Sequence, residues 1–413
     1  RRGRRGRRRR EPRERVRLAA AARPARDPAG PEAAGGPMTV AERDAALIGR
    51  SRWDLDTPAL CVDLDRLDAN IAALQAAVTR NGIGARPHAK THKCAAIARR
   101  QLAAGAIGIC TAKVGEAEAL MDAGIDHLCV TTSHPSPSVI RRAMALCRRS
   151  PHFLQAVDEA GNARDLDAAA QEAGVVADVV IDVAVGTRSG IPAGPDALAL
   201  AELVDTLPHL RLRGVLAYDG AVQHVAGFTA RRQQALAALE PHAALVDQMR
   251  RKGLCTEIFS GGGTGTYSVQ HLTPGFTDVQ AGSYVFMDMQ YLAIGGEHGP
   301  VYDDFAPSLT VLTTVLNNRF DGRLTTDAGA KALTINVPTP GVVGEPGMRY
   351  HAGADEFGVI TIESATRAYR IGDRLELLVP HCDPVVNLYD HLYAVRNDRV
   401  EAVWPIDARG RSQ

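Results

Sequence analysis

The sequence predicts an α/β fold, a (β/α)8 TIM barrel with a second, C-terminal all-β domain. From residue 59 to about residue 290, short apolar runs alternate with amphipathic stretches, which is typical of parallel strands joined by helical crossovers. After about residue 300, strand-like runs are separated by Gly, Pro and Asn-Asp turns with little helical pattern. Polar residues suited to chemistry also follow the ends of the predicted strands, where barrel enzymes place their active sites.

The first region contains one more candidate strand than a barrel needs. The candidates are Ala59–Asp63, Ala85–Lys90, Ile107–Ala112, His127–Thr132, Phe153–Val157, Asp178–Val185, Leu212–Tyr218, Thr256–Ser260 and Val279–Phe286. We expect the first of them to pair outside the barrel. The amphipathic stretches between them predict helices over Cys94–Ala104, Gly115–Ala123, Pro137–Arg149, Ala160–Glu172, Asp196–Thr206 and Thr229–Lys252. An open doubly wound sheet is disfavoured, because no Gly-x-Gly-x-x-Gly follows the first strand.

The C-terminal region predicts a separate domain made almost entirely of strands. The candidates are Leu309–Leu316, Leu324–Asp327, Val359–Glu363, Arg374–Val379, Tyr393–Arg396 and Arg399–Trp404. Together they predict an all-β domain of roughly 110 residues.

The composition excludes some classes of protein. Of the 413 residues, 45% are hydrophobic and 23% are charged, as in soluble globular proteins. No apolar run approaches the roughly 20 residues of a membrane-spanning helix, so we expect no membrane association. Seven Cys are scattered singly along the chain, which favours reduced, mostly buried thiols and a cytoplasmic location.

The N-terminal segment differs from the rest of the chain. Residues 1–37 contain 13 Arg and 4 acidic residues, whereas the remainder contains 35 basic and 43 acidic residues. With almost nothing apolar to bury, residues 1–37 are predicted to be disordered. They could form a nucleic-acid-binding arm, but we favour an extension that is not native protein, because Met38 opens an ordinary sequence. We therefore expect no nucleic-acid partner.

Lys90 is the first candidate for chemistry, in the run Arg86–Lys93 (RPHAKTHK) after the second predicted strand. The chain has only five Lys against 43 Arg, so a retained Lys suggests a need for an amine. An amine can lose its proton and form a Schiff base, which a guanidinium cannot. Its neighbours His88, His92 and Lys93 would lower its pKa. The alternative is a basic surface loop, which the local sequence alone favours.

A second candidate is the glycine-rich run Ser260–Tyr267 (SGGGTGTY). Consecutive glycines allow backbone N–H groups to surround a phosphate, and barrels often bind phosphate beside their last strands. The alternative is a flexible turn, and we favour phosphate binding slightly.

A third candidate is His381-Cys382-Asp383, which follows the predicted strand Arg374–Val379. If that strand continues, His381 and Asp383 share one face and Cys382 points away. Imidazole and carboxylate suit Zn²⁺, Mn²⁺ or Mg²⁺, and two protein ligands would leave coordination positions open for catalysis. A polar strand end without metal is the alternative, and the local sequence alone favours it.

Arg188 and Tyr218 also end predicted strands. Taken singly, a structural salt bridge and a core tyrosine are the favoured interpretations of these two residues.

Together and in order, these features resemble the metal-activated D-threonine aldolase / D-serine dehydratase family of pyridoxal 5'-phosphate (PLP) enzymes, which have the alanine-racemase-like fold. The resemblance runs from about residue 50 to residue 407. It is carried by Asp56–Ala59, Arg86–Lys93, Gly115–Glu118, the Arg188 loop, Ser260–Thr264 and His381–Pro384.

The resemblance implies an N-terminal segment at 1–49, a PLP-binding barrel at 65–295, a β domain of 50–64 plus 296–413 carrying the metal site, and a homodimer. It implies that Lys90 holds PLP as a Schiff base and that His224 lies near the substrate hydroxyl, as the two catalytic residues. The other PLP-binding residues it implies are Arg188, Tyr218, Gly262, Gly263, Thr264 and Tyr284. His381 and Asp383 would bind the divalent metal.

Three departures from the family pattern bear on the reaction. Ala112 stands where many relatives carry Gln, and Phe357 replaces the His of a Glu-Glu-His-Gly segment. D-Serine dehydratases tend to use Cys as the second metal ligand, whereas this chain has Asp383. The last two changes favour aldolases and hydroxyaspartate-acting relatives.

We therefore predict a D-threonine aldolase that cleaves a D-3-hydroxy-amino acid to glycine and an aldehyde by a retro-aldol. The alternatives are a D-3-hydroxyaspartate aldolase, a dehydratase of D-serine or D-threo-3-hydroxyaspartate, and, less favoured, a racemase. A non-enzymatic PLP carrier is disfavoured, because such carriers are single barrels without the β domain.

Overall fold

The computed structural model describes residues 40–413. The predicted disorder of residues 1–37 lies outside these residues. The chain divides into two units, Arg1–Arg43 and Asp44–Gln413, and everything below concerns the second. Helix α1 (Val40–Leu47) spans the boundary between the units, and a short 3-10 helix, η1 (Arg52–Asp54), follows it.

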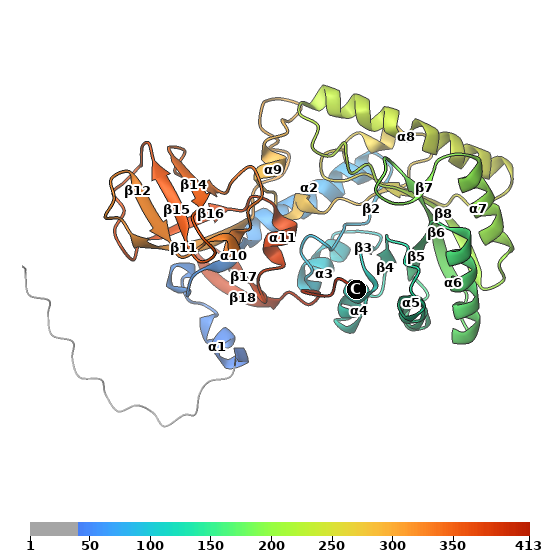
Figure 1. Cartoon of the computed structure of the whole chain (residues 1–413), viewed down its shortest axis with the longest axis horizontal. Helices are drawn as coiled ribbons and strands as arrows, with labels where there is room; N and C mark the ends of the chain where they lie inside the picture. Colours follow the sequence, from blue (N-terminus) through green and yellow to red (C-terminus); the bar gives the residue numbers. More distant parts are fainter. Residues whose placement is uncertain (1–39) are drawn as a thin grey trace, which may run out of the picture. The chain divides into compact units, whose positions relative to one another are not determined.

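A sheet of parallel strands forms the barrel (Figure 1). Its order is β2-β10-β9-β8-β6-β5-β4-β3, and β7 pairs with β6. A parallel bridge between His88 and Cys110 joins the segment after β2 to β3. The bounds are β2 (Gly84–Ala85), β3 (Ile109–Thr111), β4 (Leu128–Val130), β5 (Leu154–Val157), β6 (Ala177–Ala184), β7 (Ile191–Pro192), β8 (Leu210–Ala217), β9 (Ile258–Gly261) and β10 (Asp278–Val279). The predicted barrel is confirmed.

Helices alternate with these strands along the chain, as the sequence predicts. They are α2 (Leu64–Arg80), α3 (Ala95–Ala103), α4 (Val114–Asp122), α5 (Pro137–Arg149), α6 (Ala160–Ala173), α7 (Pro195–Thr206) and α8 (Phe228–Arg251). Helix α2 was not among the predicted helices. Its N-cap residue is Asp63, whose carboxylate accepts a hydrogen bond from the N–H of Arg66 (3.0 Å). The helix buries Leu67, Ile71, Leu74 and other residues at helical spacing.

Several predicted barrel strands are shorter than expected, and two of them are reduced to two residues. The regular strand predicted over Ala85–Lys90 ends at Ala85, although bonds to the neighbouring segments continue as far as Ala89, whose N–H donates to the carbonyl of Cys110 (2.8 Å). The chain then turns, because the N–H groups of His92 and Lys93 both donate to the carbonyl of Ala89 (3.1 and 2.7 Å). The strand predicted over Val279–Phe286 ends at Val279 and is followed by the 3-10 helix η3 (Ser283–Val285). A Cβ atom at Gly282 would lie 2.5 Å from the Thr91 hydroxyl, so this backbone packs directly against the Lys90 turn.

The C-terminal domain is a mainly antiparallel sheet in the order β12-β15-β14-β13-β16-β11-β1-β17-β18, and β12 also pairs with β11. Its strands are β1 (Ala59–Asp63), β11 (Leu309–Asn317), β12 (Arg323–Thr326), β13 (Gly341–Val342), β14 (Met348–Ala352), β15 (Gly358–Ile362), β16 (Arg374–Leu378), β17 (His391–Arg396) and β18 (Arg399–Pro405). The first predicted strand therefore pairs outside the barrel. β13 and β14 were missed because neither is an apolar run.

Short helical segments also lie between the strands, and among them only α9 falls between the last barrel strand and the C-terminal sheet. They are the 3-10 helix η2 (Gln270–Leu272) and the helices α9 (Met289–Leu292), α10 (Ala330–Leu333) and α11 (Cys382–Val386). All seven Cys are free thiols and six of them are buried, as predicted. Within residues 40–413, no helix is both long enough and apolar enough to cross a membrane.

Candidate active site

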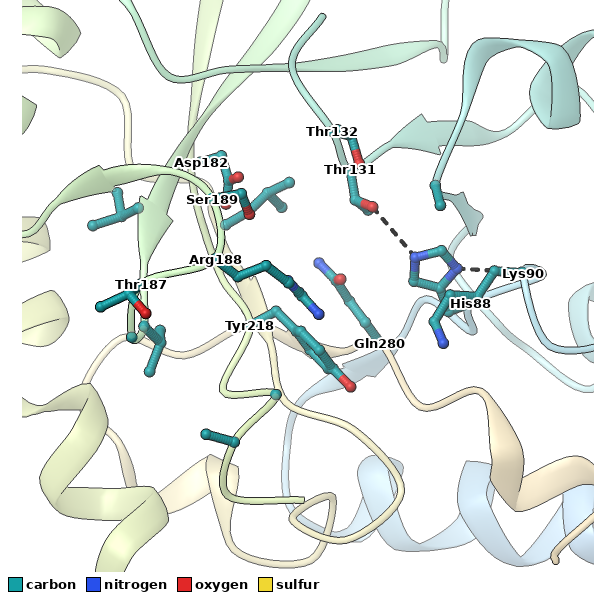
Figure 2. Close-up of a pocket in the computed structure, with 17 residues that line it drawn as sticks. His88, Lys90, Thr131, Thr132, Asp182, Thr187, Arg188, Ser189, Tyr218 and Gln280 are labelled. Atoms are coloured by element: carbon teal, nitrogen blue, oxygen red, sulfur yellow. Dashed lines mark hydrogen bonds between the residues drawn. The ribbon is translucent and has the colours of Figure 1, made fainter. Parts of the chain in front are cut away.

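A cavity of about 540 Å³ opens at the carboxyl ends of the barrel strands (Figure 2). This volume suits a small organic ligand. Each of the strands β2, β3, β4, β6, β8 and β10 is followed by at least one residue that lines it, which agrees with the expected position of the site. Polar side chains in its wall include those of His88, Lys90, Thr131, Thr132, Asp182, Arg188, Tyr218 and Gln280.

Lys90 lies in the turn after β2, next to His88. The N–H of Lys90 donates to His88 Nδ1 (3.3 Å), and His88 Nε2 lies 3.3 Å from the hydroxyl of Thr131, which itself donates to the carbonyl of Thr111 (3.2 Å). These contacts assign the ring proton to Nε2. Burial, with a further contribution from the charge of Lys90, lowers the pKa of His88 to about 3. His88 is therefore a neutral donor in the wall of the cavity.

Arg188 and Tyr218 form the opposite wall (Figure 2). The Arg188 guanidinium carbon lies 5.4 Å from the centre of the Tyr218 ring. Cβ atoms at Gly220 and Gly263 would lie 3.0 and 3.3 Å from atoms of that ring, so glycines flank both of its edges. This arrangement leaves a flat aromatic surface beside a cation, which suits a planar ring bearing an ionised hydroxyl.

The glycine-rich turn lies behind Tyr218 and does not itself line the cavity. Gly262 has φ of +60°, and within residues 40–413 the N–H groups of Gly262 and Thr264 have no acceptor. The rest of the turn is held by the side chains of Gln223 and Thr266, which accept from the N–H groups of Gly265 (2.9 Å) and Gly263 (3.2 Å). Two free N–H groups in a fixed turn suit a phosphate.

Tyr284 lies under the same turn. Its N–H donates to the Thr264 hydroxyl (3.0 Å), and its own hydroxyl accepts from Gln101 Nε2 (3.0 Å). The structure thus joins Tyr284 to the predicted phosphate turn through the backbone, while its hydroxyl is engaged with helix α3.

An ion pair between Lys90 and Asp383 joins the barrel cavity to the C-terminal domain. Although burial alone would lower the pKa of Lys90, the Asp383 carboxylate raises it above its ordinary value. The pKa of Asp383 lies well below its ordinary value, because the charges of Lys90 and His381 outweigh the effect of burial. The two residues that the sequence assigned to the cofactor and to the metal are therefore in direct contact.

The expected strand through His381, Cys382 and Asp383 is wrong. β16 ends at Leu378, and His381 is the N-cap residue of helix α11. The chain turns here because the N–H of Cys382 donates to the carboxylate of Asp288 (3.0 Å) instead of continuing a strand. The period-two argument for a shared face therefore does not apply, although Asp383 acts on the charge of His381.

Asp288 was missed by the sequence analysis. Its carboxylate lies 3.0 Å from His381 Nδ1, and one ligand atom each from Asp288, His381 and Cys382 lie within 4.8 Å of one another. Burial lowers the pKa of His381, but Asp288 and Asp383 together raise it above its ordinary value. The sequence signal that could have found Asp288 is an N-cap Asp immediately before a short helix.

Asp288, His381, Cys382 and Asp383 are called the acidic cluster below. His224 lies in the loop after β8, where the charges of Asp288 and His381 act on it. Its ring centre is 4.6 Å from that of Tyr291 in helix α9. Burial lowers the pKa of His224, and the charges of His381 and Lys90 lower it further while Asp288 opposes them. At neutral pH the ring is therefore a free base.

Donor chemistry supports both groups implied by the resemblance. A lysine amine and a cation beside an aromatic face surround the cavity, and a turn with free N–H groups lies behind it, so these residues fit PLP. Imidazole nitrogen and carboxylate oxygen beside the cavity fit Mn²⁺, Mg²⁺ or Zn²⁺.

Comparison with protein families supports the same assignment. Residues 62–290 match the model of the alanine racemase N-terminal domain, and residues 308–395 match a putative serine dehydratase domain. D-Threonine aldolase from Arthrobacter sp. is 38% identical over 360 residues, which are 87% of this chain and 94% of that protein. The chain belongs to the D-threonine aldolase / D-serine dehydratase family. The fold of this family implies PLP and a metal.

Another relative and two solved structures extend the comparison. 3-Hydroxy-D-aspartate aldolase from Paracoccus denitrificans is 34% identical over 89% of this chain and 95% of that protein. The crystal structure of D-threonine aldolase from Filomicrobium marinum matches with a TM-score of 0.85 and 33% identity, covering 89% of this chain and 99% of that one. D-threo-3-Hydroxyaspartate dehydratase from Delftia sp. HT23 matches with a TM-score of 0.76 and 29% identity, covering 86% and 98%. Aldolases and dehydratases are both lyases, so this is a family of lyases.

Of the departures from the family pattern, Ala112 lies at the cavity and Phe357 lies away from it. Ala112 lines the cavity, where a smaller side chain leaves room. Phe357 is 48% exposed and precedes β15, and it contributes nothing to the cavity wall.

Proposed function

We propose that this enzyme is a PLP- and divalent-metal-dependent aldolase that cleaves D-3-hydroxy-amino acids, D-threonine among them, to glycine and an aldehyde. The observation that carries the proposal is the contact between Lys90 and Asp383 at the cavity. It puts the amine that would hold the cofactor next to a carboxylate that would hold the metal. A substrate whose amino group lies beside Lys90 would have its β-hydroxyl within reach of a metal held by His381 and Asp383.

When bound, PLP supplies an electron sink for the carbon–carbon bond cleavage, and the metal lowers the pKa of the substrate hydroxyl. Arg188 and Tyr218 would orient the cofactor ring, and the N–H groups of Gly262 and Thr264 would hold its phosphate. His88 donates from Nε2 at the cavity wall and keeps the Lys90 turn in place through its Nδ1.

His224 is the proposed general base. It is neutral because its pKa is lowered, so it can take the proton of the β-hydroxyl as the bond between Cα and Cβ breaks. His381 cannot serve in this role, since its Nδ1 is engaged by Asp288 and its Nε2 would hold the metal.

A dehydratase is the second candidate, and it needs the same residues. There Lys90 would remove the α-proton, and the metal would assist the departure of the β-hydroxyl. The Delftia relative in this family is a D-threo-3-hydroxyaspartate dehydratase. By the resemblance, a carboxylate at position 383 in place of the Cys that D-serine dehydratases tend to use favours the aldolase.

Product analysis with D-threonine separates the two reactions. An aldolase releases glycine and acetaldehyde, which are detected by chromatography and by a coupled alcohol dehydrogenase assay. Release of a 2-oxo acid and ammonia would contradict the aldolase and support the dehydratase. With D-threo- and D-erythro-3-hydroxyaspartate an aldolase releases glycine and glyoxylate, so the rate of glycine release measured by chromatography decides between the two aldolase substrates.

We propose Mn²⁺ as the activating metal, a homodimer as the assembly and the cytoplasm as the compartment. The free, mostly buried thiols support a reducing compartment. Activity with each divalent ion after treatment with a chelator tests the metal, and sedimentation equilibrium tests the dimer.

A further inference from the structure

Asp288 has no assigned role in the reaction proposed above, yet its side chain is one of the most completely bonded in the site. It is fully buried, with an exposed fraction of 0%. Oδ2 accepts from the N–H of Cys382 (3.0 Å), lies 3.0 Å from His381 Nδ1, and accepts from the thiol of Cys382 (3.2 Å). Oδ1 accepts from the N–H of Tyr291 (3.0 Å).

These contacts join two elements that come from different parts of the chain. His381 and Cys382 begin helix α11 in the C-terminal domain. Tyr291 belongs to helix α9, of which Asp288 is the N-cap residue, and the ring of Tyr291 contacts the ring of His224. One carboxylate therefore contacts the imidazole expected to bind the metal and caps the helix that carries Tyr291, the residue against which the expected base lies.

The backbone is strained just before this residue. Met287 has φ of +54°, a left-handed conformation that costs a residue with a side chain free energy. The conformation directs Asp288 into the junction between the two helices, where the N–H of Met289 also bonds to the carbonyl of Val379 (3.1 Å). Strain that the surrounding structure maintains is typical of functional sites.

We propose that Asp288 is a positioning residue for the metal centre: it holds His381 through Nδ1 so that Nε2 is the ligating nitrogen, and it holds helix α9 so that Tyr291 orients His224. The proposal rests on the proposed function, because it takes His381 as a metal ligand. Within residues 40–413, Nε2 of His381 has no hydrogen-bond partner, so it is the nitrogen available to an ion.

The physical basis is the hydrogen bond that metal-binding histidines donate from their second nitrogen. A carboxylate there fixes the ring orientation and makes the other nitrogen a better donor to the metal. Asn at position 288 keeps the size of Asp, but it removes the negative charge and one of the two oxygens. The NH2 group of the amide would then face either the donors of His381 and Cys382 or the N–H of Tyr291, and it cannot accept a hydrogen bond from any of them. His381 would lose its fixed orientation.

The test measures Mn²⁺ affinity by the electron paramagnetic resonance signal of free Mn²⁺, with PLP-loaded enzyme in the absence of substrate. We compare wild type with Asp288→Asn, His381→Ala and Glu345→Gln. Glu345 is a matched control: it is a buried acid of the C-terminal domain, to which His381 also belongs, and it is bonded to Thr366 and Tyr369 outside the cluster. The visible absorbance of bound PLP and the unfolding midpoint of each variant are recorded in parallel.

For Asp288→Asn we expect a dissociation constant for Mn²⁺ raised by about 10- to 100-fold, with the PLP absorbance retained. Glu345→Gln should leave Mn²⁺ affinity unchanged even if its unfolding midpoint falls, and His381→Ala should abolish tight binding. Because no turnover is measured, the result does not depend on which reaction the enzyme catalyses.

Three outcomes would overturn the proposal. Unchanged Mn²⁺ affinity in Asp288→Asn removes the positioning role, and a loss as complete as in His381→Ala makes Asp288 a ligand instead. Equal losses in Asp288→Asn and Glu345→Gln show a general structural effect. If wild type binds PLP but no Mn²⁺, the metal-dependent function fails together with the inference, whereas Mn²⁺ binding without aldol cleavage leaves the inference standing and removes only the function.

Discussion

The two halves of the site are built in different ways. The cavity wall comes from the ends of parallel strands, with side chains such as His88 and Tyr218 arranged around open space. The acidic cluster comes from the first residues of helices α9 and α11, and the Asp288 carboxylate alone takes part in four close contacts. A space bounded by an aromatic face and a cation suits an organic cofactor, whereas converging charged ligands suit an ion. Lys90 and Asp383 are where the two halves meet.

Removing the amine tests the cavity half and should have the largest effect. Lys90→Ala is expected to abolish the visible absorbance of bound PLP and to lower kcat/KM by roughly 10³-fold or more, because the cofactor loses its covalent attachment. Lys252→Ala is the control, since Lys252 lies half-exposed at the end of α8 and pairs with Glu202. Retained absorbance in Lys90→Ala would move the cofactor to another residue.

Removing the expected metal ligand Asp383 tests the other half. Asp383→Asn should retain PLP absorbance but lower kcat by about 10²- to 10³-fold, because a metal contributes several kcal/mol of charge stabilisation to the transition state. A chelator should inhibit the wild type, and added Mn²⁺ should restore its activity but not that of the variant. Chelator-resistant activity in the wild type would show that the cluster is not a metal site.

A substitution at His224 tests whether a base acts between the two halves without binding either the cofactor or the metal. His224→Gln should lower kcat by about 10²-fold, with both PLP absorbance and Mn²⁺ affinity unchanged. Since burial lowers the pKa of His224, the acidic limb of the wild-type profile of kcat/KM against pH should fall below the ordinary histidine value of about 6.5. An unaltered profile in His224→Gln would assign the base to another group.

The smallest expected effect concerns the stability of the cavity half. Burial and the charge of Asp158 raise the pKa of Asp182 in the cavity wall from 3.8 to about 6. Because the pKa of this carboxyl group is raised on folding, ionisation of Asp182 destabilises the folded state. This destabilisation is absent below pH 3.8 and complete above about pH 6. Asp182→Asn should therefore raise the free energy of unfolding at pH 7.5 by up to about 3 kcal/mol, with the gain shrinking as the pH approaches 4.

Asp178→Asn provides the opposite expectation on the same strand. Asp178 is buried and pairs with Arg211 and Arg213. Its replacement removes the carboxylate from Arg211 and leaves Arg213 with Glu257 alone, which should destabilise the protein. Urea unfolding at several pH values measures both variants. If Asp182→Asn is instead destabilised at pH 7.5, the ionised Asp182 carboxylate does not lower the free energy of unfolding.

How far the sequence predicts the site also differs between the halves. The barrel and its active end follow from apolar runs and from polar residues just after them, and both signals are local. Arg188 and Tyr218 could be placed by this rule, and both line the cavity. The rule requires only that strands be parallel, which their alternation with helices already indicates.

The cluster half could not be predicted in the same way. His381 and Asp383 were chosen from strand periodicity and from a family resemblance, but the segment is the start of a helix. Asp288 gave no periodic signal, because it follows the left-handed Met287 and a single turn of 3-10 helix. Its role depends on contacts with residues more than 90 positions away, such as the hydrogen bond from Cys382, which is 94 residues further along the chain. Such contacts arise from tertiary structure alone.

The central claim is that Lys90 carries PLP at the mouth of the barrel. Reduction of the purified holoenzyme with borohydride, followed by proteolysis and mass spectrometry, tests it most directly. The account predicts that the peptide containing Lys90 gains the mass of a reduced pyridoxyl phosphate group and that no other lysine peptide does. A modification on Lys93 or Lys113 instead, or on no lysine at all, would contradict it.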